Sequence, residues 1–322
     1  MATLEVRSLT KWYGPVRGVE EVSFALERGE IFGYLGPNGA GKTTTLRCIM
    51  GLLRPCAGEV LALGEPVQPG RATRHDRLGY LPGEFRLWPG IRARTSLRVL
   101  ASLGGGDRAQ SRRSELAERL ELDLDRPVGE LSKGNRQKVA VIYAFQHRPE
   151  LLILDEPTSG LDPLVRQTVL DLIREAAHDG ATVLLSSHDL SEVGAVCGRA
   201  AIVRAGRLVE MGPISKLIQH GEHRLRVWFV DATLAPPVPL GQLPGVRVIE
   251  QQPGQLHLAY QGACEAVLRW VAQFPVDRIA TPQTSLEEAF IQYYKTEPPA
   301  ALRVTTTAAV VAGTGSAPKG DQ

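Results

Sequence analysis

The chain has 322 residues, of which 43% are apolar and 22% are charged, and its formal net charge is +2. These values are ordinary for a globular protein, and they exclude a chain dominated by disorder or by an acidic or basic tail. The length corresponds to about two domains of 100–200 residues each, so we expect a second domain behind the first.

From residue 31 to about residue 211, short apolar runs alternate with helix-like segments. A parallel sheet with helical crossovers produces this alternation, which predicts the α/β class. The predicted strands lie at 31–36, 151–155, 182–187 and 200–204. Helices are predicted where apolar residues recur at helical spacing, over 42–50 and 164–178. The letters RAGR at 204–207 predict a hairpin turn, and the stretch from about 84 to 150 predicts a helical insert.

Beyond residue 220 the pattern changes to alternating strands followed by helices, which predicts a small α+β domain over 221–296. Its predicted strands lie at 225–230, 246–250 and 256–260. One helix is predicted over 263–274, and another begins at Ser285, which has the spacing of a capping box with Glu288. The stretch 297–322 has few large apolar residues and is predicted to be a disordered tail. The first domain is therefore expected to span 1–220.

The cysteines show neither C-x-x-C pairing nor the spacing of a metal site. This pattern predicts free thiols that are buried, and disfavours a metal site or a disulfide framework. The four residues concerned are Cys48, Cys56, Cys197 and Cys264.

The longest apolar run, at 139–145, is far shorter than the roughly 18 residues that a membrane-spanning helix needs. The N-terminal stretch also lacks the apolar core of a signal peptide. We therefore expect a cytosolic protein, and if it works at a membrane, another polypeptide must supply the spanning helices. Arginines cluster between Arg71 and Arg98, and we interpret this cluster as a solvated face in preference to a nucleic-acid surface.

The stretch GYLGPNGAGKTTTLRCIMG, residues 33–51, matches the pattern G-x-x-x-x-G-K-[ST] between a predicted strand and a predicted helix. The match rests on Gly36, Gly41, Lys42 and Thr43. Glycines let successive backbone N–H groups point at a phosphate, and Lys42 adds a charge for the outer phosphates. Thr43 can offer its hydroxyl to Mg²⁺, and the helix start favours the anion further. The alternative is a glycine-rich turn that matches by accident, and the flanking strand and helix argue against it.

A carboxylate for the metal follows the predicted strand LLILD at 151–155. Asp155 emerges at the carboxyl end of that strand, where open α/β sheets hold their ligands. We predict that Asp155 holds the Mg²⁺ shell and that Glu156, the next residue, orients and deprotonates a water for attack on the γ-phosphate. The alternative is an acidic strand end that caps the following helix.

The stretch LSKGNRQK at 131–138 resembles the L-S-G-G-Q signature of ATP-binding cassette (ABC) ATPases, and it departs at Lys133 and Asn135. Other motifs of that family follow in order, and the resemblance covers about residues 4–215. SGLD at 159–162 is similar to the D-loop, and the histidine of SSHDL at 186–190 resembles the switch histidine. KWYG at 11–14 has its tyrosine at the position where the family stacks an aromatic ring on adenine.

The resemblance implies an ABC-type P-loop nucleotide-binding domain with a RecA-like core, an antiparallel β subdomain and a helical subdomain at about 84–150. It implies ATP and Mg²⁺ as cofactors. Tyr13 would stack on adenine, Asp162 would lie at the nucleotide in the D-loop, and His188 would hold the γ-phosphate beside the base Glu156. The phosphates and metal would be held by Asp155 and by Gly36, Pro37, Asn38, Gly39, Ala40, Gly41, Lys42, Thr43 and Thr44.

Ser132 is also a good N-cap for the helix predicted after it, so that helix start is a second anion site. In the family, the residues at Ser132 and Gly134 contact the γ-phosphate that the other subunit holds. The resemblance therefore implies a head-to-tail homodimer that sandwiches two ATP molecules and is released by hydrolysis.

One departure concerns the segment GYLPGEFRLWPG at 79–90, which lies where the family has its Q-loop. Gly83 occupies the position of the usual glutamine, so the ordinary metal or water contact from this loop is lost. Glu84 and Arg86 are candidates to replace it in coupling to a membrane partner. A permissive surface loop explains the same residues equally well.

The stretch TSLEEAFIQYYKTE at 284–297 is similar to the end of the ATPase subunits of type-two ABC exporters, which include drug, antibiotic-resistance and sodium exporters. We therefore expect an exporter ATPase that lies on the inner face of the cell membrane beneath separately encoded permease subunits and binds no nucleic acid. The domain at 221–296 is expected to help hold two cassettes together.

The alternatives are a soluble ABC ATPase that acts on ribosomes or DNA, and a regulatory module that scarcely hydrolyses ATP. The first is disfavoured because the chain shows neither two cassettes nor a long coiled-coil insert. The second is disfavoured by Glu156 and His188.

Overall fold

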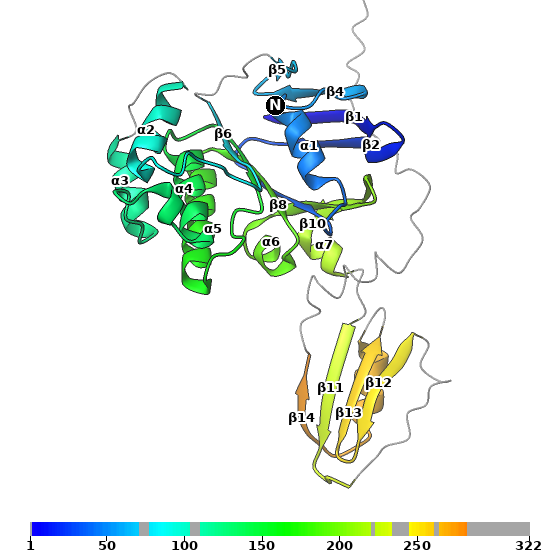
Figure 1. Cartoon of the computed structure of the whole chain (residues 1–322). Coiled ribbons are helices and arrows are strands. Elements are labelled where there is room, and N and C mark those ends of the chain that lie inside the picture. Colours follow the sequence, from blue (N-terminus) through cyan, green and yellow to red (C-terminus); the bar gives the residue numbers. More distant parts are fainter. Residues whose placement is uncertain are drawn as a thin grey trace, which may run out of the picture.

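The computed structural model describes residues 2–70, 77–103, 110–219, 223–233, 245–260 and 264–281. Its strands form three sheets, one of six strands and two of four. In Figure 1 the six-stranded sheet lies between the N-terminal sheet and a group of helices, and the strands after residue 222 form a sheet of their own.

The six-stranded sheet has the strand order β10-β9-β3-β8-β7-β6. Its strands are β3 (Ile31–Leu35), β6 (Leu78–Leu81), β7 (Leu151–Asp155), β8 (Thr182–Ser187), β9 (Arg199–Arg204) and β10 (Arg207–Pro213). β6, β7, β8, β3 and β9 pair in parallel, and β10 pairs antiparallel with β9. The predicted α/β class and its four predicted strands are confirmed, whereas β6 lies outside those predictions. Because the strands are parallel, the carboxyl ends of β3, β7 and β8 meet at one edge.

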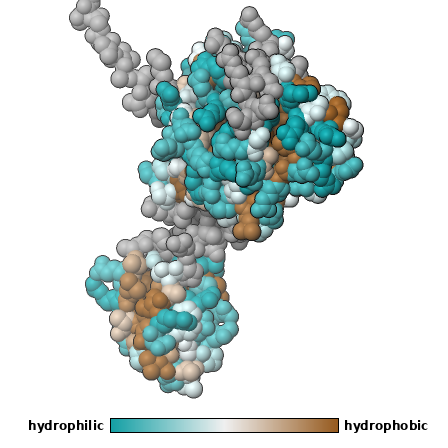
Figure 2. Space-filling model, turned by 90° about the vertical axis from the view of Figure 1, so that its left-hand side faces the viewer, coloured by the Kyte–Doolittle hydropathy of each residue, from teal (hydrophilic) through white to brown (hydrophobic). Residues whose placement is uncertain are grey.

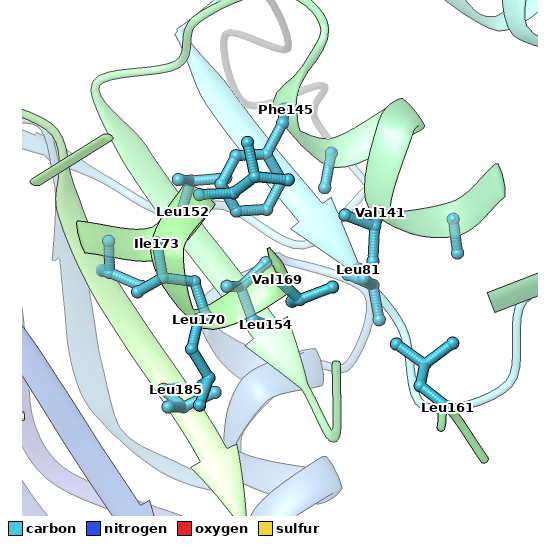
Figure 3. Close-up of a cluster of buried hydrophobic side chains, with 14 of the residues drawn as sticks. Leu81, Val141, Phe145, Leu152, Leu154, Leu161, Val169, Leu170, Ile173 and Leu185 are labelled. Carbon is cyan, nitrogen blue, oxygen red and sulfur yellow. The ribbon is translucent and has the colours of Figure 1, made fainter. Parts of the chain in front are cut away.

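Alternate residues of the central strands enter different hydrophobic cores. Leu152 and Leu154 of β7, with Leu185 of β8, belong to a cluster that is covered by side chains of α4 and α5 (Figure 3). Ile153 and Leu184 belong to a second cluster, which includes α1 and the N-terminal sheet. Both faces of these strands are therefore buried, which explains their continuous apolar runs.

Outside the stretch 84–150, the described residues form four helices before residue 220: α1 (Lys42–Ile49), α5 (Pro163–His178), α6 (Leu190–Val196) and α7 (Ile214–Gln219). The helices predicted over 42–50 and 164–178 are confirmed. α5 begins where Asp162 accepts the N–H groups of Leu164 and Val165, with a proline in the first turn. α6 is capped in the same way by Asp189, which directly follows the loop residue His188.

The predicted turn at 204–207 joins β9 and β10 as an antiparallel hairpin. Ala205 and Gly206 have φ angles of +48° and +80°. Two consecutive positive φ angles are typical of a type I′ turn, whose twist matches that of the flanking strands. The hairpin prediction is confirmed.

The N-terminal sheet has the order β2-β1-β4-β5 and is antiparallel throughout. Its strands are β1 (Leu4–Tyr13), β2 (Val16–Leu26), β4 (Ala57–Ala62) and β5 (Glu65–Pro66). This is the antiparallel β subdomain that the family resemblance implies. β1 ends at Tyr13, which places that side chain beside the start of α1.

The stretch from 84 to 150 contains helices and no strand among its described residues. They are α2 (Ala93–Leu103), α3 (Gln110–Arg119), the 3-10 helix η1 (Val128–Glu130) and α4 (Lys133–Phe145). The helical insert is confirmed, and α4 packs back onto β6.

The third sheet has the order β12-β13-β11-β14. Its strands are β11 (His223–Phe229), β12 (Val246–Gln252), β13 (Gln255–Tyr260) and β14 (Val276–Ala280), with one helix, α8 (Glu265–Val271). Three predicted strands are confirmed, β14 was not predicted, and α8 is shorter than the predicted span of 263–274. One sheet face and α8 share a cluster that includes Val227, Phe229 and Trp270. The helix predicted from Ser285 and the tail at 297–322 lie outside the described residues.

All four cysteines are free thiols. Cys48 and Cys197 are buried as expected, whereas Cys56 and Cys264 are exposed, so the expectation of burial is wrong for those two. Cys56 directly precedes β4 at the surface, and Cys264 is the N-cap of α8. Among the described residues, no helix combines the length and the apolar character that a membrane span requires.

Candidate functional site

The loop at residues 36–41 joins the carboxyl end of β3 to the start of α1. Gly39 and Gly41 have φ angles of +80° and +102°, which side chains rarely tolerate. A methyl group built on Gly36 would lie 2.5 Å from the carbonyl oxygen of Val203, and one on Gly41 would lie 2.6 Å from the carbonyl oxygen of Gly18. The loop can therefore adopt this path only with glycine at these positions. It curls around the amino end of α1, where backbone N–H groups can bind an anion.

Lys42 is the first residue of α1 and only 6% of its side chain is exposed. Its Nζ donates to the carbonyl oxygens of Gly36 and Pro37, at 2.5 and 3.4 Å. The same atom lies 3.2 Å from Oε1 of Glu156. The lysine thus crosses back over its own loop, and its charge is balanced by the carboxylate that follows β7.

Asp155 ends β7 and is 1% exposed. Its Oδ2 accepts the hydroxyl of Thr43 at 2.8 Å, and its Oδ1 accepts the hydroxyl of Ser186 at 2.5 Å. The neighbouring oxygens of Thr43 and Asp155 are hard ligands of the kind Mg²⁺ prefers, and Mg²⁺ commonly takes only one or two carboxylates plus substrate phosphates. Among the described residues, no group of three or more His, Cys, Asp or Glu side chains is arranged to hold a metal ion.

Glu156 has a φ of +52°, a left-handed conformation that costs a non-glycine residue about 1–2 kcal/mol. Its backbone N–H donates to the carbonyl oxygen of Ser186 at 3.1 Å, which ties the turn to the neighbouring strand β8. Its Oε2 lies 2.6 Å from Nδ1 of His188, the first residue after β8. The carboxylate is therefore held between Lys42 and His188, at the edge where the strands end.

Tyr13 lies at the side of this group, at the end of β1. Its hydroxyl is 3.4 Å from Oγ1 of Thr44, and 44% of the residue is exposed. The Nζ of Lys11 lies 5.6 Å from the ring centroid. An accessible aromatic face beside the glycine-rich loop is the arrangement that base stacking requires.

The remaining loop residues have ordinary surroundings. Ala40 is buried and its N–H donates to the carbonyl oxygen of Pro37 at 3.1 Å, whereas Asn38 is exposed. Together with Lys42, Thr43, Asp155, Glu156 and His188, the loop forms one contiguous site. We call it the cradle site.

Ser132, Gly134 and Asp162 lie on a different set of turns. Ser132 caps α4, and its Oγ accepts the N–H of Asn135 at 3.1 Å. A methyl group on Gly134 would lie 3.0 Å from the carbonyl oxygen of Gly160, so the start of α4 packs closely on the turn before Asp162. The pKa of Asp162 is lowered because its carboxylate accepts backbone N–H groups, first among them that of Val165.

Gly83 lies against Asp155. A methyl group built on it would be 3.1 Å from Oδ2 of Asp155, so this loop approaches the carboxylate through its backbone. The Glu84 carboxylate is exposed and accepts the guanidinium of Arg86 at 2.9 Å. Glu84 therefore points to solvent and to Arg86, and its role in coupling to a membrane partner stays a prediction.

Two residues that contact the cradle site were not predicted as site residues from the sequence. Ser186 bonds Asp155, and Gln137 of α4 donates to the carbonyl oxygens of Glu156 and Pro157. A signal for Ser186 was the hydroxyl at the polar end of an otherwise apolar strand. Gln137 stands within the quoted stretch LSKGNRQK, where a half-buried amide precedes the apolar part of the helix.

Comparisons with known proteins identify a family and relatives for this chain. The sequence profile of the family described as ABC transporter matches residues 19–159. The chain is 38% identical over 226 residues to a Nod factor export ATP-binding protein I from Burkholderia orbicola, covering 68% of this chain and 73% of that relative. It is 36% identical over 213 residues to a probable multidrug ABC transporter ATP-binding protein of Escherichia coli, covering 65% of this chain and 37% of that relative.

Solved structures give the same family. An ATP-binding subunit of an ABC transporter superposes with a TM-score of 0.63 at 33% identity, covering 67% of this chain and 91% of that chain. A dimeric ATP-binding cassette bound to ADP and Pi superposes with a TM-score of 0.59 at 24% identity, covering 65% of this chain and 98% of that chain. The second likeness is one of fold alone.

Proposed function

This chain belongs to the ABC transporter ATP-binding family, and on that premise we propose that it is the ATP-hydrolysing subunit of an exporter with a separately encoded membrane permease. The exporter class is supported by relatives whose names refer to Nod factor export and to multidrug transport. The alternative of a soluble ABC ATPase acting on ribosomes or DNA has no comparable support.

The observation that carries the proposal is the grouping of Lys42, Glu156 and His188 at the glycine-rich loop. ATP would place its phosphates against the backbone N–H groups of the loop, with Lys42 on the outer phosphates and Tyr13 on the adenine. Thr43 and Asp155 would hold Mg²⁺, which neutralises charge on the phosphates when it is bound.

Hydrolysis then requires a positioned water. Glu156 would orient that water and accept its proton while the water oxygen attacks the γ-phosphorus and the bond to the bridging oxygen of ADP breaks. His188, which contacts Glu156 through Nδ1, would hold the γ-phosphate with its other ring nitrogen. ADP and inorganic phosphate leave as products. Positioning and charge neutralisation supply most of the rate.

We also propose a head-to-tail homodimer. The start of α4 at Ser132 and Gly134 is a capped helix N-terminus, and such a terminus favours an anion. It would contact the γ-phosphate held by the cradle site of the partner subunit, so that two ATP molecules lie in the interface. The assembly would lie on the inner face of the membrane, beneath the permease.

The substitution Glu156→Gln tests this function. The variant should bind Mg-ATP, hydrolyse it at least about tenfold more slowly, since a positioned base commonly contributes 10²-fold or more, and accumulate an ATP-bound dimer. Turnover and sedimentation with ATP measure both effects. The matched control is Glu118→Gln, because Glu118 is an exposed glutamate on α3. A fully active, monomeric Glu156→Gln protein contradicts the assignment.

The exporter class has a separate test. The tagged chain is purified with a mild detergent from membranes of the organism that naturally produces it. We expect an integral membrane protein to copurify with it. Recovery with ribosomes or DNA, and with no membrane protein, would favour the alternative class.

A further inference from the structure

Gln137 joins α4 to the turn that carries Glu156. Its Nε2 donates to the carbonyl oxygen of Glu156 at 3.2 Å and to that of Pro157 at 2.9 Å. These two carbonyls are consecutive in the chain, and the side chain that bridges them is half-buried. One amide of the helical insert thus holds two peptide groups that directly follow β7.

The turn that Gln137 holds is a strained one. Glu156 adopts a φ of +52°, and such a conformation persists in a non-glycine residue only where the surroundings over-determine it. Two backbone hydrogen bonds contribute, from Glu156 N–H to the Ser186 carbonyl and from Ser159 N–H to the Glu156 carbonyl, each at 3.1 Å. Gln137 adds a side-chain donor to that same Glu156 carbonyl. The direction of the Glu156 carboxylate therefore depends on where α4 lies.

The start of α4 contacts the same segment a second time. A methyl group on Gly134 would lie 3.0 Å from the carbonyl oxygen of Gly160, and the aliphatic stem of Lys133 lies over Gly160. The segment 156–160 is thus bound to α4 at both of its ends. We therefore expect a displacement of this helix start to move the turn at Glu156.

We propose that Gln137 is a positioning residue for ATP hydrolysis, which holds the Glu156–Pro157 turn so that the Glu156 carboxylate faces the cradle site. This inference rests on the proposed function, in which Glu156 accepts the proton of the attacking water. Ser132 and Gln137 are five residues apart on one helix, about 7.5 Å along its axis. A phosphate of the partner subunit's nucleotide at Ser132 would therefore act on Glu156 of this subunit through α4 and Gln137.

The test compares variants of the full chain that differ in the amide donor. Gln137→Met keeps the length of the side chain and removes the donor, and Gln137→Glu removes the donor while keeping a polar group, in case the methionine variant folds poorly. Both should lower kcat about tenfold or more, because a misplacement of about 1 Å at a catalytic group can cost 10²-fold. The dissociation constant for Mg-ATP should not change. Gln137→Lys restores a donor and is expected to recover part of kcat.

The matched control is Gln167→Met, since Gln167 is an exposed glutamine on α5 that donates to Asp171. A second readout separates positioning from general structure: in a Glu156→Gln background, Gln137→Met should slow turnover no further. Wild-type kcat in Gln137→Met and Gln137→Glu overturns the inference while leaving the function of Glu156 intact. An equal further loss in the Glu156→Gln background also overturns it. Full turnover by Glu156→Gln alone overturns the proposed function and this inference together.

Discussion

The Nζ of Lys42 lies 3.2 Å from Oε1 of Glu156, and both side chains are largely shielded, with exposed fractions of 6% and 20%. The other carboxylate oxygen, Oε2, lies 2.6 Å from Nδ1 of His188. A phosphate in the cradle site would compete with Glu156 for the same ammonium group. On the proposed function, nucleotide binding therefore releases Oε1 of Glu156 for the water that it must orient.

Lys42→Ala should weaken ATP binding itself. The variant removes a buried cation that donates to the loop carbonyls at the place proposed for the phosphates. Hydrogen bonds to charged groups contribute about 1.5–3 kcal/mol, which corresponds to a rise in dissociation constant of about 10- to 140-fold. A fluorescence titration with a nucleotide analogue measures this change. Lys216→Ala on α7 is the control, and unchanged affinity in Lys42→Ala would count against the cradle.

Much of the central sheet could be predicted because β3, β7 and β8 are buried on both faces and so appear as continuous apolar runs. β6 and β14, which are among the strands without a predicted range, lack this signal. β6 has only the four residues LGYL, and β14, VDRIA, interrupts its apolar residues with charges. Both depend on their neighbours for hydrogen bonds, and sequence-distant pairing is not visible in a local pattern.

The site could be predicted where the spacing of residues within a short motif indicates their role, as for Lys42, Thr43 and the carboxylates at the end of β7. The contact of Gln137 with Glu156 could not, because it joins residues that are 19 apart in the chain and belong to different elements. The left-handed conformation of Glu156 is likewise set by tertiary contacts, since no glycine at that position announces it. Exposure of Cys56 and Cys264 depends on their places at element ends.

Gly83→Ala should raise the Mg²⁺ concentration needed for half-maximal hydrolysis. The added methyl group would lie 3.1 Å from Oδ2 of Asp155, the oxygen that accepts the Thr43 hydroxyl, so the carboxylate must shift. A Mg²⁺ titration at saturating ATP, with Mg²⁺-dependent ATP binding as a second readout, measures the effect. Gly90→Ala is the matched control, because no atom within 4 Å would meet its methyl group. Identical Mg²⁺ curves for Gly83→Ala and wild type would exclude this role.

Glu192→Gln should gain stability relative to the wild type as pH rises. Glu192 is 4% exposed on α6, and burial raises the pKa of its carboxyl above the ordinary value of 4.5, despite hydrogen bonds that include the Ser187 hydroxyl. A raised folded pKa means that the folded state binds more protons than the unfolded state. The wild type therefore loses stability as pH rises from below 4.5 through the folded pKa, whereas glutamine stays neutral.

Thermal unfolding at pH 4 and pH 7 checks this prediction. The melting temperature of Glu192→Gln minus that of the wild type should be larger at pH 7 than at pH 4. Glu118→Gln, at an exposed position, should show no such trend. A difference that stays constant or falls between the two pH values would contradict the raised pKa.

Removal of the region after residue 219 should weaken dimerisation without nucleotide and leave ATP binding nearly intact. The third sheet and α8 have a hydrophobic cluster of their own, and all cradle-site residues lie upstream of residue 219. In Figure 2, apolar surface is visible over the third sheet and α8, in the lower part of the view. The exposed apolar residues of this region include Val230, Leu268 and Ile279. Exposed apolar surface commonly marks contact surfaces, and we propose that this surface packs against the same region of a second copy of the chain.

Light scattering over a concentration series compares the full chain with residues 1–219, while a nucleotide titration checks that the shortened chain still binds ATP. The same monomer–dimer balance in both proteins would show that this region does not hold the cassettes together.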